Sequence, residues 1–262
     1  MKIAAITVTF NSADTLTRHW KPCTNPKFSW IVIDNASRDG TAQTARSLGA
    51  EVVELSENIG FSGANNIGAT VASDADCLVF VNPDITLDAD GLQRLAEEAV
   101  HRQCIAAPQL LNHDGSMQEN GRRMPYLYRK ILHFFNMKGS RTQYEVFAGL
   151  GEIVPATWAI GAAIAIPADL FRKIGGWDDR FFLYYEDSDI CLRASRMGIP
   201  TYLVGDVRWH HGWKRETRRS LNLAAWRREV SSALKFYGRY PPLLLHPRIA
   251  PRRFKEVGEL CV

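Results

Sequence analysis

The sequence is poor in cysteine and has no long apolar run. Five cysteines occur among 262 residues, and no two of them form a CxxC pair. An odd number without paired spacing argues against a disulfide framework or a cysteine zinc site and suits a reducing compartment. The longest predominantly apolar run, Trp158 to Ile166, lies between Pro155 and Pro167. It is well short of the roughly 20 residues that a membrane-spanning helix needs, so it predicts buried core.

The net charge of the chain is also small. The formal net charge is +4 and charged residues make up 23%, which is ordinary for a globular protein. This balance does not by itself choose among nucleic acid, an anionic membrane and a phosphorylated small molecule as partner. The N-terminus has one lysine and a short β-branched run, without the length or the cleavage site of a signal peptide. We therefore expect a cytoplasmic protein.

Two common nucleotide-binding signatures are missing. The chain contains neither G-x-G-x-x-G nor G-x-x-x-x-G-K-[ST], so dinucleotide-binding and P-loop functions lose their main support. Residues 56–69 instead hold three glycines and three asparagines. Glycines let the backbone approach a ligand closely, and asparagine amides bind hydroxyls and phosphates.

Apolar β-rich runs alternate with helix signals through the first half of the chain. Strands are predicted over 2–10, 30–34, 50–55 and 77–81, and helices up to residue 19 and over 41–48, 62–73 and 88–103. Repeated βα units of this length predict an α/β fold with a mostly parallel central sheet flanked by helices. Parallel sheets bind ligands at the carboxyl ends of their strands. The sequence places polar residues there, namely Asn11, Asp34, Asn58 and Asp84.

The second half is less regular. Residues 112–150 show no clear period and predict a loop-rich segment over the site. Beyond it we expect a strand followed by a short helix over 167–175, a helix ending at Gly198, a strand over 201–211 and a helix over 220–237. No linker separates two independent domains.

Two carboxylates at strand ends suit either a turn or a ligand. Asp34 precedes a turn-rich stretch, where it either caps the turn or accepts a hydrogen bond from the imide N–H of a pyrimidine base. Asp84 ends an apolar strand in the sequence Asn82-Pro83-Asp84. Pro83 stiffens the backbone, which suits a turn and equally suits an Asp that holds Mg²⁺ or Mn²⁺ on a diphosphate.

A third acidic group follows an aromatic run and opens a predicted helix. It consists of Glu186, Asp187 and Asp189. The helix dipole favours acids at this position, and Asp189 is expected to pair with Arg193 one turn later. Aromatic neighbours also desolvate a carboxylate and raise its pKa, which is how a general base is tuned.

Basic residues gather near the end of the chain. His210 and His211 precede Lys214 and Arg215, an arrangement that suits either a diphosphate clamp or a solvated basic patch. Further arginines accompany Trp226 and a Pro-Pro-Leu-Leu-Leu run: Arg218, Arg219, Arg227, Arg228, Arg239, Arg248, Arg252 and Arg253. This region is either a solvated basic surface with packing leucines or a surface that docks peripherally on the anionic inner face of a membrane.

Taken in order, these stretches resemble the successive signatures of inverting family 2 glycosyltransferases with the GT-A fold, in particular a bacterial rhamnosyltransferase-like branch. They are VTFNSADTL, VIDNASRDGT, ENIGFSGANNIGA, FVNPDI, WAIGAAIAIP, GGWDDRFFLYYEDSDICLR and HHG, and they cover about residues 1–215. The resemblance implies a nucleotide-sugar-binding half over about 1–110, an acceptor-binding and catalytic half over about 111–215, and a helical, basic extension over 216–262.

The resemblance also implies which residues bind the donor. Asp34 would hold the base, and Asp84 with His210 would hold a divalent cation, Mg²⁺ or Mn²⁺. Asn82 stands where the family's D-x-D-like motif has its first carboxylate, so metal affinity would depend on Asp84 and the diphosphate. Further donor-binding positions would be Thr9, Asn11, Asn58, Gly60, Asn65 and His211.

On the acceptor side, Trp158 and Gly161 would line the sugar and acceptor site. Asp187 of the Glu186-Asp187 pair would be the catalytic base, and Glu186 would orient the site or bind acceptor hydroxyls. These assignments follow from the resemblance alone.

The implied reaction transfers a sugar from a nucleotide-diphosphate donor to a hydroxyl of a glycan, glycolipid or lipid-linked acceptor, with inversion, in cell-surface polysaccharide synthesis. The branch suggests L-rhamnose from dTDP-L-rhamnose, and a UDP-sugar is the main competing donor. A nucleotidyltransferase or a non-catalytic nucleotide-sugar-binding module on the same fold would explain some of the motifs. Neither accounts for the whole ordered set, and nucleic acid is not an expected partner.

Overall fold

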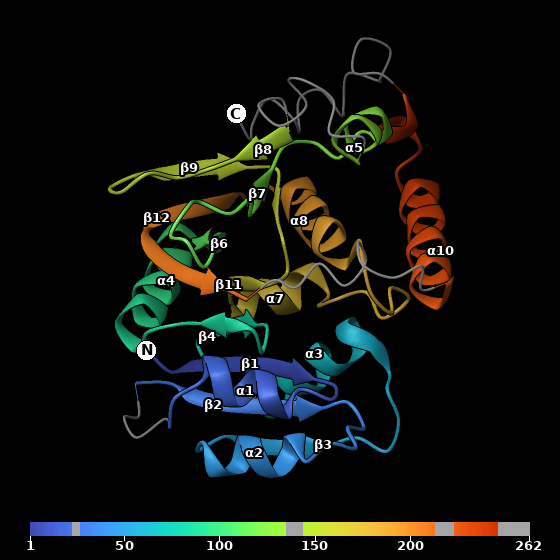
Figure 1. The fold of residues 1–262 in the computed structure, drawn as a ribbon. Helices are drawn as coiled ribbons and strands as arrows, with labels where there is room; N and C mark the ends of the chain where they lie inside the picture. The colour runs from blue at the N-terminus through green and yellow to red at the C-terminus, as the bar shows by residue number, and fades with distance from the viewer. Residues whose placement is uncertain (23–26, 135–143, 213–222, 246–262) are drawn as a thin grey trace.

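The computed structural model describes residues 1–22, 27–134, 144–212 and 223–245, and one large sheet organises them (Figure 1). Its strands are β1 (Ile3–Thr9), β2 (Ser29–Asp34), β3 (Glu51–Glu54), β4 (Cys77–Val81), β5 (Ile85–Thr86), β6 (Ile105–Leu111), β9 (Ile153–Ala156), β11 (Ala163–Pro167) and β12 (Thr201–His211). The helices are α1 (Ala13–His19), α2 (Thr41–Ser47), α3 (Gly60–Val71), α4 (Ala89–Arg102), α5 (Leu127–Phe134), α7 (Ala168–Ile174), α8 (Glu186–Arg196) and α10 (Leu223–Arg239), followed by the 3₁₀ turn η1 (Pro241–Leu244).

The strand order across the sheet is β3-β2-β1-β4-β11-β6-β12-β5, and β9 also pairs with β12. Strands β3, β2, β1 and β4 are parallel to one another. Strand β11 runs antiparallel between β4 and β6, whereas β6 and β12 are again parallel. The predicted α/β fold with a mostly parallel sheet is therefore confirmed, and the sheet continues from the N-terminal into the C-terminal half of the chain.

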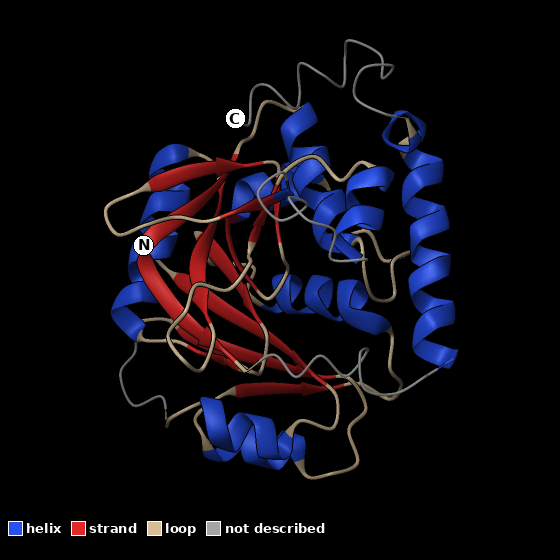
Figure 2. Ribbon diagram, turned by 45° about the horizontal axis from the view of Figure 1, so that its top comes forward, coloured by secondary structure: helices blue, strands red, loops and turns tan. Residues whose placement is uncertain are grey.

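Strand residues alternate between two apolar layers, one on each face of the sheet. Ile6 and Ile33 belong to the layer covered by α3, α7 and α8. Ala5 and Val32, their neighbours in sequence, belong to the layer covered by α1, α2 and α4. Figure 2 shows these helices on both sides of the strands. Burial on both faces explains why the central strands are almost wholly apolar.

Helix α4 illustrates how local sequence sets an element. Asp88 is extended and accepts a hydrogen bond from the Gly91 N–H at 2.7 Å, which caps the helix. The buried residues Leu92, Leu95, Ala96 and Ala99 recur at helical spacing and face the sheet. The chain leaves the helix at Gln103, which has a φ of 52°.

Strand β6 is central in the sheet, and the sequence analysis assigned no element to it. Its Pro108 has no N–H for a hydrogen-bond ladder. The register of β6 against β12 shifts between Val204 and Arg208, next to the pairing of Pro108 with Val204. The irregular ladder therefore accommodates a proline that would be unfavourable in a regular central strand.

A smaller three-stranded sheet and an aromatic cluster complete the C-terminal half. The small sheet contains β7 (Gly121–Arg122), β8 (Glu145–Val146) and β10 (Trp158–Ala159). Helix α10 joins the rest of the protein through a cluster that buries Met124, Tyr126, Phe181, Leu192, Phe236, Tyr237, Tyr240 and Leu243. No helix in the described ranges is long and apolar enough to cross a membrane.

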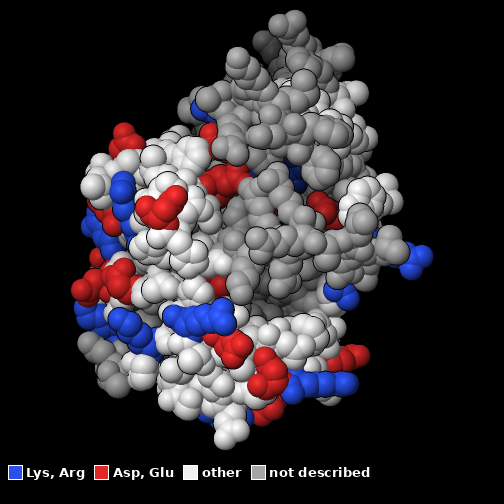
Figure 3. Space-filling view, in the orientation of Figure 1, with Lys and Arg blue, Asp and Glu red and all other residues white. Residues whose placement is uncertain are grey.

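Acidic and basic side chains are interspersed on the face of the molecule that Figure 3 shows. Among the described residues on this face, therefore, neither sign of charge forms a continuous field.

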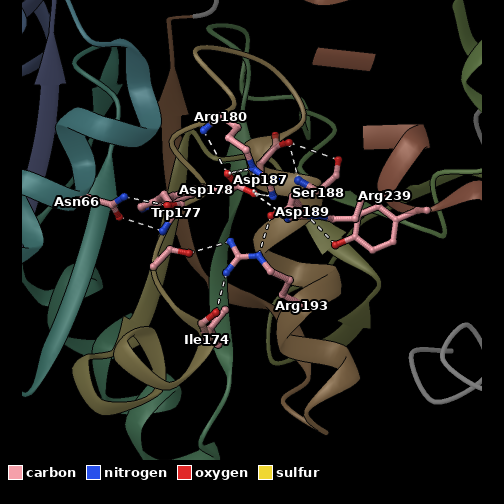
Figure 4. A network of polar contacts seen from close by, with 12 residues as sticks. Asn66, Ile174, Trp177, Asp178, Arg180, Asp187, Ser188, Asp189, Arg193 and Arg239 are labelled. Atoms are coloured by element: carbon pink, nitrogen blue, oxygen red, sulfur yellow. Dashed lines mark hydrogen bonds and ion pairs between the residues drawn. The ribbon is translucent and has the colours of Figure 1, made fainter. Parts of the chain in front are cut away.

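A buried carboxylate, Asp189, connects three elements of the C-terminal half (Figure 4). It is fully buried and accepts hydrogen bonds from Arg193 Nε at 2.7 Å, from Arg239 at 2.6 Å and from the Tyr240 hydroxyl at 2.9 Å. The expected pair of Asp189 with Arg193 is thus confirmed. Asp189 has two further donors, Arg239 at the C-terminal end of α10 and Tyr240, the next residue.

The same arginines extend the network. Arg193 donates to the carbonyls of Ile174 and Gly176, both at 2.7 Å, at the end of α7. Arg239 also pairs with Asp178 at 2.7 Å, in the loop that leads toward α8. Asp189 and its partners therefore fix α8, the end of α7 and α10 relative to one another.

We predict that Asp189→Asn lowers the free energy of unfolding by about 3 kcal/mol, because it leaves the half-buried Arg193 guanidinium without its carboxylate partner and removes one of the two carboxylate partners of Arg239. Urea unfolding with a constant m-value measures this loss. Lys2→Met is the control: it breaks the exposed Lys2–Asp74 pair and should leave the midpoint unchanged. A shift in Asp189→Asn as small as that of the control would contradict the role of the network.

Candidate active site

The carboxyl ends of β1 and β2 bring two predicted donor-binding residues together. In the parallel register Thr9 is paired with Asp34, and the Thr9 hydroxyl donates to Asp34 Oδ1 at 3.1 Å. The Ser37 backbone N–H donates to Asp34 Oδ2 at 3.2 Å, and the Ser37 hydroxyl bonds Oδ1. Two of the bonds fall on Oδ1 and one on Oδ2, so Oδ2 keeps one acceptor position for a ligand N–H.

The polar residues beside Asp34 hold the neighbouring loops. Asn11 has a φ of 50°, donates its N–H to the Ser37 hydroxyl at 2.8 Å and accepts the Arg38 N–H at 2.9 Å. Asn35 donates to the Gly60 carbonyl at 3.1 Å and accepts the Ile59 N–H at 2.9 Å. Asn35, which the sequence analysis did not select, thereby ties the end of β2 to the start of α3.

The three predicted donor-binding residues of the glycine- and asparagine-rich stretch, Asn58, Gly60 and Asn65, have contacts within the protein. Asn58 accepts the Gly60 N–H at 3.0 Å, and Asn65 donates to the Phe61 carbonyl at 3.0 Å inside α3. Gly60 has a φ of 86°, and a Cβ there would lie 2.6 Å from the Phe182 carbonyl oxygen. Glycine is therefore required at this position by close packing against the loop that precedes α8.

At the end of β4, Asp84 lies beside a histidine. Its Oδ2 is 3.4 Å from His211 Nε2, and His211 is buried at the end of β12. His211 Nδ1 lies 2.6 Å from Gln118 Oε1, while the Gln118 amide nitrogen donates to Asn112. The Gln118 oxygen thus accepts the Nδ1 proton, so Nε2 faces Asp84 either with a second proton or with its lone pair.

The charges around Asp84 favour its ionised form. Burial alone would raise the pKa of Asp84, but hydrogen bonding and charge from His211, with a smaller effect of His19, hold it below its ordinary value. Burial in turn lowers the pKa of His19. Asp84 is therefore a carboxylate at neutral pH, with one imidazole nitrogen turned toward it.

The structure changes the histidine assignment. His210 was expected beside Asp84, but its side chain is exposed, and His211 makes the contact instead. The reason is the strand geometry of β12: consecutive side chains point to opposite faces, so only one of two adjacent histidines faces the site. Lys214 and Arg215 lie outside the described residues.

A short hydrogen-bonded path joins the Asp84 turn to the predicted base. The Asn82 N–H donates to the Ala162 carbonyl at 2.8 Å. The next residue back, Gly161, donates its N–H to Asp187 Oδ2 at 3.2 Å. The antiparallel strand β11 thus places the predicted metal-side and base-side residues on adjoining segments.

The pair Glu186-Asp187 opens α8 after two strained residues. Tyr184 and Tyr185 have φ values of 73° and 70°, in the left-handed region that non-glycine residues rarely adopt. Each such residue costs about 1–3 kcal/mol and persists only where its surroundings enforce it. Strain of this kind immediately before two acidic side chains is typical of a functional site.

The two acids differ in their hydrogen bonds. Asp187 accepts the Gly161 N–H through Oδ2 and the Ser188 N–H, at 2.7 Å, through Oδ1. Glu186 is buried, and its Oε2 has no partner among the described residues. Burial raises the pKa of both groups, that of Glu186 well above its ordinary value with a further effect of the Asp187 charge. The hydrogen-bond donors favour the ionised form of Asp187, whereas the raised pKa of Glu186 favours its neutral form.

Trp158 lies in an aromatic and cationic environment close to this pair. Its indole N–H donates to the Arg123 carbonyl at 3.1 Å, and its ring centroid is 6.3 Å from that of Tyr144. The Lys130 ammonium lies 5.3 Å from the Trp158 ring centroid and 3.7 Å from that of Tyr185. Lys130 and Gln118 were not selected from the sequence, because both fall in the segment 112–150, which has no periodicity.

The arrangement combines a carboxylate and an imidazole at one strand end with a buried acid pair nearby. Carboxylate oxygen and imidazole nitrogen are suitable ligands for Mn²⁺, and a carboxylate with waters and phosphates suits Mg²⁺. No group of three or more His, Cys, Asp or Glu that could hold a metal occurs among the described residues.

Comparison with known proteins identifies relatives. The profile of Glycosyl transferase family 2 matches residues 4–160, more than half of the chain. An N-acetylglucosaminyl-diphospho-decaprenol L-rhamnosyltransferase of Mycobacterium tuberculosis is 28% identical over 204 residues, 70% of this chain and 66% of the relative. Rhamnosyltransferase WbbL of Escherichia coli is 25% identical over 190 residues, 69% of this chain and 70% of the relative. The chain spans about two thirds of the length of these curated relatives.

Among solved structures, GalNAc-T7 with UDP, GalNAc and Mn²⁺ superposes with a TM-score of 0.63. The sequence identity is 16%, and the match covers 99% of this chain and 54% of that chain. The likeness concerns the fold, and the expected GT-A fold is confirmed.

Proposed function

This chain belongs to glycosyl transferase family 2, and we propose that it transfers L-rhamnose from dTDP-L-rhamnose to a hydroxyl of a lipid-linked glycan, with inversion, in the synthesis of a cell-surface polysaccharide. The observation that carries the proposal is the path from Asp84 through Asn82, Ala162 and Gly161 to Asp187. It links the residues proposed to hold the diphosphate to the residue proposed as the base, which supports the proposal. The two rhamnosyltransferase relatives support the sugar, and the lipid diphosphate in the name of one supports the acceptor class.

Asp34 is proposed to bind the base of the donor. The acceptor position left on Oδ2 matches the single imide N–H that thymine or uracil offers, whereas guanine and adenine present different edges. Thr9 and Ser37 hold the carboxylate in place for this contact. A UDP-sugar remains the second candidate donor, which the UDP in the GalNAc-T7 structure favours.

Asp84 and His211 are proposed to hold a divalent cation together with the donor diphosphate. The residues fit this role, since a carboxylate and an imidazole nitrogen lie 3.4 Å apart and Gln118 fixes the imidazole orientation. A bound Mg²⁺ or Mn²⁺ would neutralise charge on the departing nucleoside diphosphate. With two protein ligands among the described residues, the proposed site leaves positions for phosphate oxygens.

Asp187 is proposed to act as the general base. Its carboxylate takes the proton of an acceptor hydroxyl while that oxygen bonds to the anomeric carbon and the bond from this carbon to the diphosphate oxygen breaks. The Gly161 and Ser188 N–H groups orient the carboxylate for this step. Neutral Glu186 has a free carboxyl oxygen that suits a hydrogen bond with a sugar hydroxyl.

The proposed function is tested with a panel of dTDP-L-rhamnose, UDP-N-acetylglucosamine and GDP-mannose, each with and without Mn²⁺. Calorimetry should give binding of the two pyrimidine nucleotides and little binding of GDP-mannose. Mass spectrometry should then detect one deoxyhexose added to a synthetic N-acetylglucosaminyl diphospholipid. Equal affinity for GDP-mannose contradicts the role of Asp34, and the absence of product from every donor contradicts the transferase assignment.

We predict that Asp187→Asn retains donor affinity and slows single-turnover transfer by about 10²–10⁴, because the amide cannot accept the proton. Glu186→Gln is the matched control, since an amide resembles the neutral acid and should lose far less. Because the pKa of Asp187 is raised, transfer by the unchanged protein should fall as the pH drops toward that pKa and Asp187 gains a proton. Equal transfer by Asp187→Asn and the unchanged protein would move the base elsewhere.

We also predict that His211→Asn weakens Mn²⁺ binding in the presence of dTDP by about tenfold or more, because one of two protein ligands is lost. Electron paramagnetic resonance of free Mn²⁺ measures this without any turnover. His210→Asn is the control, and its exposed side chain should leave affinity unchanged. If the two variants bind Mn²⁺ equally well, the assignment of His211 is wrong.

The proposal includes contact of the C-terminal region with an anionic membrane that presents the acceptor. Trp226, Val230 and Leu234 recur every four residues along α10 and are 64%, 41% and 71% exposed. Arg227 and Arg228 beside them are exposed cations. Of the remaining arginines expected in this region, Arg239 lies in the Asp189 network, while Arg218, Arg219, Arg248, Arg252 and Arg253 lie outside the described residues.

We predict that Leu234→Ser combined with Trp226→Ser reduces co-sedimentation with phosphatidylglycerol vesicles at low salt, because it removes the apolar part of the surface. The control is Leu150→Ser, which removes an equally exposed leucine (71%) from another part of the protein. Failure of the unchanged protein to bind these vesicles, or equal binding by the double variant, contradicts the membrane contact.

A further inference from the structure

Lys130 occupies an unusual position for a lysine. It lies on α5, half-buried, with its ammonium 3.7 Å from the Tyr185 ring centroid, 5.3 Å from that of Trp158 and 5.8 Å from that of Phe236. An ammonium has three hydrogen-bond donors. In the described part of the chain none of them meets a hydrogen-bond acceptor or forms an ion pair, and the contacts of the ammonium are with aromatic rings.

Two of the three rings around Lys130 lie close in sequence to the acid pair or to a residue that binds it. Tyr185 immediately precedes Glu186, and Trp158 lies three residues before Gly161, whose N–H binds Asp187. The charged groups that act on Lys130 are Asp187 and Glu186 of α8, Arg122 of β7 and Glu229 of α10. Asp187 is the strongest of these, and its attraction opposes the repulsion from the Arg122 guanidinium.

We propose that Lys130 is a positioning residue of the transfer reaction: its ammonium, held by the rings of Tyr185, Trp158 and Phe236, keeps Asp187 ionised beside a neutral Glu186. The role of Lys130 in the reaction rests on the proposed function. A general base must be ionised before it can accept a proton, and burial opposes the charge of Asp187 unless a nearby cation stabilises it. Lys130 supplies that cation without forming an ion pair that would cover Asp187.

The protonated lysine is also costly for the fold. Burial lowers its pKa to about 8 from the ordinary 10.5, although the Asp187 charge acts in the opposite direction. Between these two values the unfolded chain binds more protons than the folded one, so stability should rise with pH across that window. Below pH 8 the folded protein carries the charge at its full cost. A cation kept under these conditions is expected to serve function rather than stability.

The test compares Lys130→Met, which keeps the stem and removes the charge, with Lys130→Arg, which restores it. Lys173→Met on α7 is the control, because Lys173 is exposed. Carbon-13 titration of the Asp187 carboxyl in the ligand-free protein, assigned with Asp187→Asn, should give a pKa about one unit or more higher in Lys130→Met. Lys130→Arg and Lys173→Met should match the unchanged protein.

The melting temperature at pH 7 should rise in Lys130→Met, and the stability gain between about pH 8 and pH 10.5 should disappear. In single-turnover transfer, the acid limb of the rate should move to higher pH by the same amount as the titration. An unmoved Asp187 pKa, an equal shift in Lys130→Arg, or a lower melting temperature in Lys130→Met overturns the proposal. The carboxyl titration and melting need no turnover, so they remain decisive even if the protein transfers no sugar.

Discussion

The position of the acid pair depends on one buried carboxylate. Asp189 lies one turn into α8 and binds two guanidinium groups and a tyrosine hydroxyl. Through them α8 is fixed against the end of α7 and against α10, and Glu186-Asp187 are fixed with it. This constraint allows Tyr184 and Tyr185 to keep left-handed backbone conformations that would otherwise relax. The strained residues Tyr184 and Tyr185 and the anchoring residue Asp189 therefore lie within six residues of one another along the chain.

Electrostatics separate the two acids that this anchor positions. Backbone N–H groups reach Asp187 from Gly161 and Ser188, whereas the buried Glu186 has an unpartnered oxygen among the residues that the structure describes. The environments push the two protonation equilibria apart, and one group becomes the carboxylate while the other remains an acid. The same logic operates at Asp84, where His211 stabilises the ionised form and Gln118 orients the imidazole.

Sequence patterns predicted the elements that repeat and the residues that end strands. Strand β4 was located at 77–81, and Thr9, Asp34 and Asp84 lie at strand ends as expected. The missed features depend on contacts between distant segments. Strand β6 contains a proline that only an irregular ladder against β12 makes acceptable. His211 rather than His210 faces Asp84. Adjacent residues of β12 point to opposite faces, and the sequence alone does not tell which face is turned toward Asp84. Lys130 and Gln118 come from an aperiodic stretch, where the sequence does not distinguish one lysine or glutamine from another. Their contacts arise only when the chain folds.

The antiparallel strand β11 has a consequence for turnover. It pairs with β4 over five residues, from Ala163 opposite Val81 to Pro167 opposite Cys77, and with β6 on its other side. The N-terminal and C-terminal strands are thus joined by backbone hydrogen bonds within a single sheet. A hinge that opened one half away from the other would have to break this ladder. Movements that open the candidate site are therefore expected in the segments around this sheet rather than between its two parts.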